Sequence, residues 1–183
     1  MPARRPTAIR TATIAAAVMA ASPLWGCDAQ QRTGAATDPR PAHTVLASNA
    51  LVVRVVDGDT IDAVVDGRRE RIRLIGIDTP ETLKPDTPVE CYGPEASART
   101  EALLPASTPI RLERDIEPRD AFGRLLAYVY RATDGLFVNL HLVAGGFARP
   151  LPFEPNTAHA DTLAGAAASA RSQSLGLWAA CSG

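Results

Sequence analysis

Lysine is almost absent from the sequence, with Lys84 alone among 183 residues, and aromatic residues make up only 5% of it. Basic charge therefore comes almost entirely from arginine, and the whole chain has a formal net charge of -1 at pH 7. Proteins that bind nucleic acid through a broad positive field are usually basic, because phosphate contacts dominate that affinity. The composition excludes such a field. A polyanion would have to be held locally, by a few arginines and a bound cation.

The sequence also lacks an apolar run long enough to cross a bilayer, which needs about 20 residues. A shorter apolar stretch, residues 12–21, follows three arginines and precedes the motif Leu-Trp-Gly-Cys, which ends at Cys27. A basic start, a short apolar stretch and small residues near a cleavage point predict an export signal over residues 1–26. The motif resembles a bacterial lipoprotein signal, in which Cys27 becomes the lipidated first residue of the mature protein. Ordinary secretory cleavage is the alternative.

Removal of residues 1–26 would leave 16 basic and 20 acidic residues, a formal charge of -4. Residues 27–48 contain no Phe, Trp or Tyr and show no sustained period, so we expect a disordered tether there. The ordered domain is then residues 49–183. The expected location is the outer side of the cell membrane, through a lipid anchor at Cys27, with free secretion as the alternative.

Cysteine is scarce, and only Cys91 and Cys181 remain after Cys27. An even pair in an exported chain predicts one disulfide, which would fix the C-terminal tail to the segment around Cys91. Two independent buried thiols are the alternative. Metal binding by two cysteines without a nearby histidine pair is disfavoured.

Alternating apolar residues and turn signals predict a mainly β fold of the α+β class. The expected strands are residues 51–56, 60–65, 69–77, 110–113 and 125–130. The dipeptide Asp66-Gly67 is a strong hairpin signal between the second and third of them. Expected helices begin at Pro94, Asn139 and Thr157. Five strands with helices inserted late are compatible with a small barrel, and no internal repeat suggests a second domain.

Charged residues gather at the predicted strand ends. Asp59 and Asp78 offer hard oxygen ligands that suit Ca²⁺ or Mg²⁺, and Arg73 offers a planar fork for phosphate oxygens. Glu81 could orient or deprotonate a water molecule, and Arg124 adds a second cation. Together these groups could cleave a phosphodiester bond. Spacing alone leaves a second interpretation open, in which the acids only cap turns and the arginines are solvated strand residues.

A resemblance favours the first interpretation. Four motifs follow one another in the chain: Val56-Asp57-Gly58-Asp59-Thr60, Arg73-Leu74-Ile75-Gly76-Ile77-Asp78-Thr79-Pro80-Glu81-Thr82, Tyr92-Gly93-Pro94-Glu95-Ala96 and Phe122-Gly123-Arg124-Leu125-Leu126-Ala127-Tyr128-Val129-Tyr130. In their order and approximate spacing they resemble the motifs of the staphylococcal nuclease, or thermonuclease, family. The resemblance implies a five-stranded OB-fold Greek-key barrel with three helices. It also implies Ca²⁺-dependent hydrolysis of DNA and RNA phosphodiester bonds.

Carried over position by position, the resemblance assigns the metal ligands to Asp59, Asp78 and the backbone carbonyl of Thr79. With so few protein carboxylates, most of the coordination shell would come from water and substrate, an irregular shell that Ca²⁺ tolerates better than Mg²⁺.

The same resemblance assigns the cleaved phosphate to Arg73 and Arg124, and the general base to Glu81. The family's best-known member holds the nucleotide with tyrosines, whereas this chain has Phe122, Leu151 and Phe153 at the matching places. The two phenyl rings can still stack on a base, but the phenolic hydrogen bonds are lost.

These observations lead to the hypothesis of an exported, lipid-anchored, monomeric nuclease whose substrate is DNA, RNA or both. The alternatives are an inactive binding module with the same barrel and an envelope scaffold lipoprotein. His141 and His159 have no partner in the motifs and are expected to be structural. Trp178, between an apolar run and Cys181, is expected to fill the core.

Overall fold

The computed structural model describes residues 44–82 and 88–181. The predicted export signal, Cys27 and residues 27–43 of the predicted tether lie outside this part of the chain, as does Lys84. No helix within the described residues is long and apolar enough to span a membrane.

Five strands form a closed barrel, as the sequence predicts. They are β1 (Ala50–Asp57), β2 (Thr60–Val65), β3 (Arg68–Leu74), β5 (Pro109–Glu113) and β6 (Leu125–Arg131). Their order is β3-β2-β1-β5-β6, and a parallel pairing of β3 with β6 closes the ring. The OB-fold class is therefore confirmed. A short strand, β7 (Leu136–Phe137), extends the sheet beyond β6.

The hairpin between β2 and β3 turns where it was predicted. Asp66 and Gly67 have φ values of 50° and 76°, and Val65 pairs with Arg68. Positive φ at both positions is what a two-residue turn of this kind requires, and it matches the twist of the flanking strands.

The third strand ends earlier than predicted. It stops at Leu74 and does not continue to Ile77, because Gly76 has a φ of 77° and reverses the chain. Ile77 and Asp78 form a separate strand, β4 (Ile77–Asp78), which pairs with β8 (Arg149–Pro150). This break places Asp78 and the residues after it beside a distant part of the chain.

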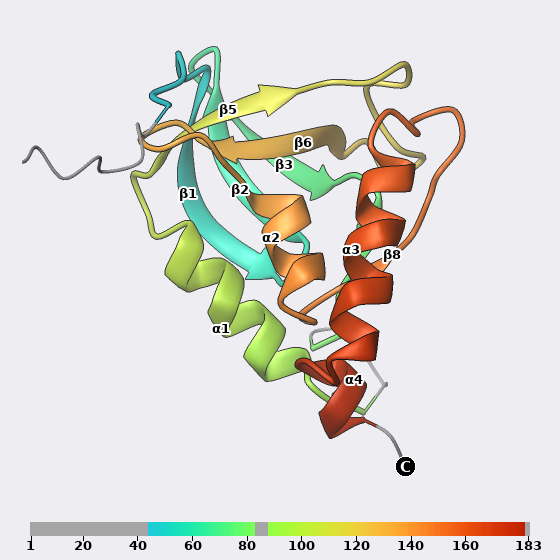
Figure 1. The fold of residues 1–183 in the computed structure, drawn as a ribbon. Helices are drawn as coiled ribbons and strands as arrows, with labels where there is room; N and C mark the ends of the chain where they lie inside the picture. Colours follow the sequence, from blue (N-terminus) through green and yellow to red (C-terminus); the bar gives the residue numbers. More distant parts are fainter. Residues whose placement is uncertain (1–43, 83–87, 182–183) are drawn as a thin grey trace, which may run out of the picture. The chain divides into compact units, whose positions relative to one another are not determined.

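Helices cover one side of the barrel (Figure 1). They are α1 (Gly93–Leu103), α2 (Val138–Ala144), α3 (Ala160–Ser172) and α4 (Leu177–Ala180). The sequence predicts three helices, and the single turn α4 was missed because four residues carry no detectable period. Helix α1 lies along β1, and α2 lies between α1 and α3 (Figure 1).

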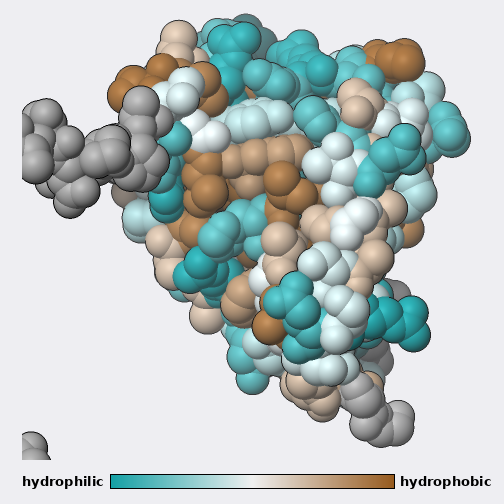
Figure 2. Space-filling view, in the orientation of Figure 1, coloured by the Kyte–Doolittle hydropathy of each residue, from teal (hydrophilic) through white to brown (hydrophobic). Residues whose placement is uncertain are grey.

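The core fills the barrel and continues under the helices. Its fully buried side chains include Ile61, Ile72 and Val129 from the strands and Leu142 and Leu163 from the helices. In the space-filling view, apolar side chains are visible in the middle of the helical side, with hydrophilic ones around them (Figure 2). Burial of each such aliphatic side chain contributes roughly 1.5–3 kcal/mol to stability.

Asn139, also fully buried, links helix α2 to the end of the barrel where β3 stops. Its side-chain amide donates to the carbonyl of Ile75 at 2.8 Å and its side-chain oxygen accepts from the Val129 amide at 3.0 Å. A buried side chain with both polar ends satisfied fixes one arrangement of its neighbours. It holds the turn after β3 against β6.

The C-terminal segment differs in one detail from the prediction. Leu177, not Trp178, fills the core, while Trp178 is half-buried between the guanidinium groups of Arg149 and Arg171. The structure contains a disulfide between Cys91 and Cys181, with Cα atoms 5.9 Å apart. It joins the start of α1 to the end of α4.

Candidate active site

Arg73 lies at the centre of the site, near the end of β3. One terminal nitrogen, Nη1, donates to the carbonyl oxygens of Leu74 and Ile77, both at 2.8 Å. The other, Nη2, lies 3.0 Å from Oδ2 of Asp59 and 3.2 Å from Oδ1 of Asp78. The side chain is only 15% exposed, so these contacts hold it firmly. Arg73 thereby links the strand end, the turn after it and both carboxylates.

Asp59 is the second of the two residues that form the turn between β1 and β2, and it is buried. Its Oδ1 accepts from the Thr60 hydroxyl at 3.0 Å and its Oδ2 from the backbone amide of Thr79 at 3.1 Å. Burial raises the pKa of Asp59 above its ordinary value, although the Arg73 guanidinium acts in the opposite direction. A second nearby cation would further favour the charged form.

Asp78 is the outer carboxylate of the pair, with a side chain about half exposed. Because Asp59 and Asp78 both lie within hydrogen-bonding distance of one nitrogen atom, their oxygens converge on a single point. Among the described residues, no three His, Cys, Asp or Glu side chains form a metal-binding group. A cation here would need backbone carbonyls, water and substrate oxygens as well.

The Thr79 side chain packs directly against Gly58. Any residue other than glycine at position 58 would collide with it. A Cβ atom built on Gly58 would lie 2.6 Å from Oγ1 and 2.9 Å from Cγ2 of Thr79. Gly58 does not have a positive φ, so the glycine is needed here for space. The buried Thr79 Oγ1 has no hydrogen-bond partner among the described residues. An all-oxygen set with an unsatisfied oxygen beside it fits a hard divalent cation.

Glu81 follows this segment on the loop after β4. Its Oε1 accepts from the backbone amide of Thr82 at 3.0 Å, and its carboxyl group lies beside that of Asp57. Its backbone amide donates to a carboxylate oxygen of Glu90 at 3.2 Å. Glu81 is thus held through both its side chain and its backbone amide.

Asp57 is a further residue of the site, for which the sequence predicted no role. Its Oδ1 accepts hydrogen bonds from the Gly58 amide, the Thr82 hydroxyl and the Ser97 hydroxyl at 2.8–2.9 Å. Burial has the largest single effect on its pKa and raises it, but the hydrogen bonds from Glu81 and these groups together lower it. Asp57 joins the turn, the Glu81 loop and helix α1. The sequence does not reveal these contacts, because Thr82 and Ser97 lie 25 and 40 residues away.

Arg124 is held by a separate turn before β6. Asp120 accepts from its Nε at 2.6 Å and from its backbone amide at 2.9 Å, and also from the Phe122 amide at 3.0 Å. Burial acts on the pKa of Asp120 upward, but the Arg124 hydrogen bond leads the contacts that lower it below its ordinary value. Because Nε binds Asp120, the guanidinium has a fixed orientation and its two terminal nitrogens can both donate to a ligand.

A hollow of about 200 Å³ brings the two arginines together. Arg73 and Arg124 contribute to its lining, and Leu151 and Phe153 supply apolar surface. Phe122, the other aromatic ring predicted to contact substrate, lies elsewhere. It is 85% exposed and lines a second hollow on the other side of Arg124.

Both histidines of the described part are packed among side chains outside this group. His141 contacts Arg99, and burial together with the charges of Arg99 and Arg131 lowers its pKa. The ring of His159 lies edge-on to Tyr128, with 4.5 Å between ring centres. These contacts agree with the structural roles expected from the sequence.

Comparison with known proteins gives one consistent match. The sequence pattern that defines the staphylococcal nuclease homologues matches residues 71–180. The thermonuclease of Staphylococcus intermedius is 45% identical over 134 residues, which are 73% of this chain and 78% of that protein. The thermonuclease of Staphylococcus hyicus is 40% identical over 147 residues, 78% and 85% of the two chains. Endonuclease YncB of Bacillus subtilis (strain 168) is 40% identical over 132 residues, 71% of this chain and 61% of its own.

Proposed function

The chain belongs to the staphylococcal nuclease family, and from that membership we propose a calcium-dependent nuclease that hydrolyses phosphodiester bonds of DNA and RNA. Its nuclease relatives support an enzyme that acts on nucleic acid. One geometric observation carries the finer proposal: Arg73 Nη2 lies within 3.2 Å of carboxylate oxygens of both Asp59 and Asp78. A guanidinium group can bind a phosphate, and two carboxylates beside it can bind the metal ion that accompanies that phosphate.

We assign the calcium ligands to Asp59, Asp78 and the backbone carbonyl of Thr79. The bound ion would neutralise charge on the phosphate and draw the substrate oxygens into place. Asp59 is fixed by three neighbours, so its carboxylate is oriented before any ion arrives. The half-exposed Asp78 can adjust, which suits the variable coordination of Ca²⁺.

Arg73 and Arg124 bind the phosphate that is cleaved. Both line the same hollow, and both are anchored, Arg73 through Nη1 and Arg124 through Nε. The terminal nitrogens of Arg124 can therefore donate to phosphoryl oxygens with little reorganisation as negative charge builds on them. Nη2 of Arg73 contacts Asp59 and Asp78, and it would turn to the phosphate once a cation takes over these carboxylates. Leu151 and Phe153 offer apolar surface to the attached nucleoside.

Glu81 acts as general base on the attacking water. Its Oε1 accepts from the backbone amide of Thr82, which holds the carboxylate beside the metal-binding segment, two residues beyond Thr79. The water would lose its proton to Glu81 as its oxygen attacks phosphorus, and the bond to the leaving oxygen would break on the opposite side. Asp57 takes no direct part in this step and positions the loop.

We also propose export, with lipidation of Cys27 and action as a monomer. The sequence of residues 1–27 motivates the export signal, and the Cys91–Cys181 disulfide supports an oxidising compartment. Metabolic labelling with a radioactive fatty acid tests the anchor: label should enter the wild type and not Cys27→Ser. Equal labelling of both proteins would rule out the anchor at this residue.

The decisive experiment is a cleavage assay on single-stranded DNA, double-stranded DNA and RNA with Ca²⁺, Mg²⁺ or a chelator. We expect cleavage with Ca²⁺, none with chelator, and a loss of at least about 1,000-fold in Glu81→Gln. Glu101→Gln, an exposed change on α1, is the matched control and should leave the rate unchanged. Full activity in chelator, or in Glu81→Gln, would refute the mechanism. Binding without cleavage by the wild type would instead indicate a binding module.

A further inference from the structure

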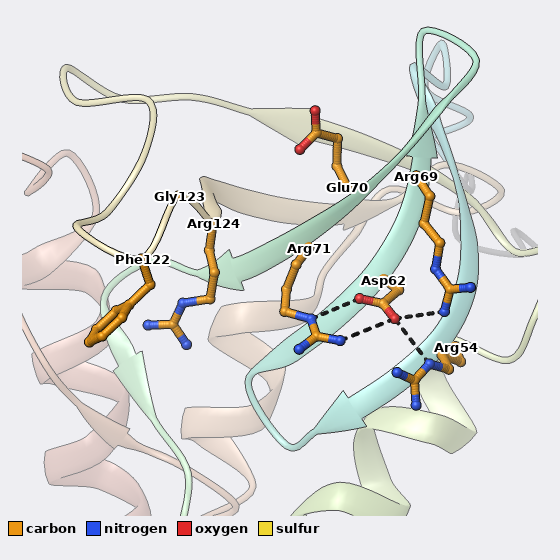
Figure 3. Close-up of a pocket in the computed structure, with 8 residues that line it drawn as sticks. All are labelled: Arg54, Asp62, Arg69, Glu70, Arg71, Phe122, Gly123 and Arg124. Carbon is orange, nitrogen blue, oxygen red and sulfur yellow. Dashed lines mark hydrogen bonds and ion pairs between the residues drawn. The ribbon is translucent and has the colours of Figure 1, made fainter.

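A second, larger hollow lies beside the proposed active site, over strands β1, β2 and β3 (Figure 3). Its volume is about 590 Å³, and arginines dominate its lining. Figure 3 shows Arg54, Arg69 and Arg71 pointing toward the carboxylate of Asp62, with Arg124 and Phe122 beyond them. The proposed mechanism gives no role to Asp62 or to the three arginines around it, Arg54, Arg69 and Arg71.

Asp62 holds the three arginines in place. Its carboxylate accepts from Nε of Arg54 at 3.0 Å, from Nη2 of Arg69 at 2.8 Å and from Nε of Arg71 at 2.9 Å. The Asp62 side chain is 4% exposed, whereas those of the arginines are 47–55% exposed. The acid therefore lies behind the cations, and solvent meets guanidinium groups. Only part of each guanidinium faces Asp62, and the remaining N–H groups can serve a ligand.

The hollow carries a positive charge that its acids do not cancel. Its lining contains four arginines and two acids, Asp62 and Glu70, a formal balance of +2. Glu70 is already paired with Arg119 at 3.0 Å, so it takes little charge from the hollow. A local excess of this kind contrasts with the net charge of -1 of the whole chain. It marks this surface as the place where a polyanion would be attracted.

The cluster leads directly to the proposed catalytic arginine. Arg69, Arg71 and Arg73 occupy alternate positions of β3 and so lie on one face of the strand. Residues two apart in a strand are roughly 6.6 Å apart, so the row spans roughly 13 Å. At the ~3.4 Å rise per nucleotide of a stacked strand, this length accommodates at most about four nucleotides.

Arg124 connects the two hollows, because it lines both. Its guanidinium carbon lies 5.5 Å from the centre of the Phe122 ring, which is 85% exposed. An exposed aromatic ring beside cations is the arrangement on which unpaired bases stack. A duplex keeps its bases stacked on each other, so this platform favours a single strand.

We propose that Arg54, Arg69 and Arg71, held by Asp62, bind the phosphates of nucleotides that flank the cleaved bond, with Phe122 stacking one of their bases. The protein then binds a single-stranded polynucleotide of several nucleotides and contacts it well beyond the bond that is cleaved. This inference rests on the proposed function, because the flanking nucleotides continue from the phosphate that binds in the proposed active site. Asp62 is a positioning residue, which arranges the arginines and does not touch the substrate.

The test measures binding and cleavage by the full chain as a function of substrate length. The test variant combines Arg54→Gln, Arg69→Gln, Arg71→Gln and Asp62→Asn, which lowers the charge by two without leaving a buried carboxylate unpaired. The control, Arg111→Gln with Arg171→Gln, lowers the charge by two at positions on β5 and α3 that do not line the hollow. Both are made in the wild type for cleavage and in Glu81→Gln for binding.

For a single-stranded octanucleotide we expect the test variant to lose about tenfold or more in affinity, and its salt dependence to fall by about 2 in log–log slope. Its kcat/KM for a dinucleotide, which cannot reach the cluster, should stay within about twofold of the wild type. The control should change the octanucleotide affinity less than about threefold. Circular dichroism verifies the fold, and the single exposed change Arg54→Gln should give a smaller loss in the same direction.

Octanucleotide binding by the test variant equal to that of the control would overturn the inference, as would equal losses on both substrate lengths. If the test variant loses binding to phosphatidylglycerol vesicles but keeps octanucleotide binding, the surface faces a membrane and the inference also fails. A wild type that binds the octanucleotide through the cluster but cleaves nothing in Ca²⁺ would refute the nuclease while supporting the cluster as a polynucleotide site.

Discussion

The hydroxyl of Thr100 donates a hydrogen bond of 2.6 Å to the carbonyl oxygen of Gly58, which fastens helix α1 to the turn between β1 and β2. Thr79 packs against the same glycine through its side chain. The turn that carries Asp57 and Asp59 is therefore held on both sides. A Cβ atom added at position 58 must displace the Thr79 side chain.

Gly58→Ala should therefore reduce both stability and metal-dependent activity. The new methyl group meets the Thr79 side chain, whose Cβ would lie 2.8 Å away and cannot rotate aside. Overpacking of this kind costs about 1–3 kcal/mol in the free energy of unfolding. Urea denaturation and a Ca²⁺ titration of cleavage measure the two effects. Gly165→Ala is the control, because nothing lies within 4 Å of its added Cβ, and α3 should gain up to about 1 kcal/mol.

Arg73→Lys should lower the cleavage rate by at least about 100-fold, although the charge is kept. One ammonium group cannot reach two carbonyls and two carboxylates at the distances that Nη1 and Nη2 span. Initial rates at saturating Ca²⁺ measure the loss. Arg111→Lys on β5 serves as control and should behave as wild type. A rate for Arg73→Lys within threefold of the wild type would contradict the role given to the guanidinium fork.

Asp62→Asn should destabilise the protein at neutral pH and lose this effect in acid. Burial alone would raise the pKa of Asp62, but hydrogen bonds from Arg71 and Arg69 lower it from 3.8 to about 2. A folded-state pKa below the unfolded one stabilises the protein above the unfolded value, and this stabilisation is lost as pH falls through the folded value. The shift corresponds to about 2 kcal/mol.

Urea denaturation from pH 7 to pH 3 tests this dependence. The difference in unfolding free energy between wild type and Asp62→Asn should be constant down to about pH 5 and shrink below pH 4. Asp66→Asn, in the exposed hairpin turn, is the matched control. A difference that does not vary over this pH range would show that the Asp62 carboxylate is not stabilised by the arginines.

Loss of the disulfide should lower the free energy of unfolding by about 2–5 kcal/mol. The bond closes a loop with a sequence separation of 90 residues, so its absence leaves the unfolded chain much freer. Cys91→Ser with Cys181→Ser, compared with wild type in urea, measures the effect. Alkylation before and after reduction, followed by intact mass, checks the pairing. Two thiols that react in the unreduced native protein would exclude the bond.

Local signals in the sequence were sufficient for the barrel strands. Asp66-Gly67 determines the hairpin because positive φ at two adjacent positions restricts the residue types. The end of β3 was wrong by three residues, since Leu74, Ile75 and Ile77 continue the apolar run. What ends the strand is Gly76, where an added Cβ would lie 2.6 Å from a methyl group of Leu163, 87 positions further along the chain. No local pattern contains that contact.

The site shows the same division between near and distant contacts. Arg73, Asp59 and Asp78 were predicted to act together because their motifs are short and consecutive, and the structure brings their side chains into contact. Asp62 could have been found too, because the hairpin register that pairs Val65 with Arg68 also pairs Asp62 with Arg71. Its contact with Arg54 could not have been predicted in this way. That contact depends on the register of β1, which shifts between Val52 and Arg54 and is not visible in the sequence.

The disulfide has a consequence for how the protein withstands proteolysis. The turn from Arg114 to Gly123 is mostly exposed and lies between the two bonded cysteines. A single cut there leaves an N-terminal piece with Cys91 and a C-terminal piece with Cys181, still joined through sulfur. Asp59, Arg73 and Glu81 are on the first piece and Arg124 is on the second. A nicked molecule therefore retains every group of the proposed active site in one covalent unit.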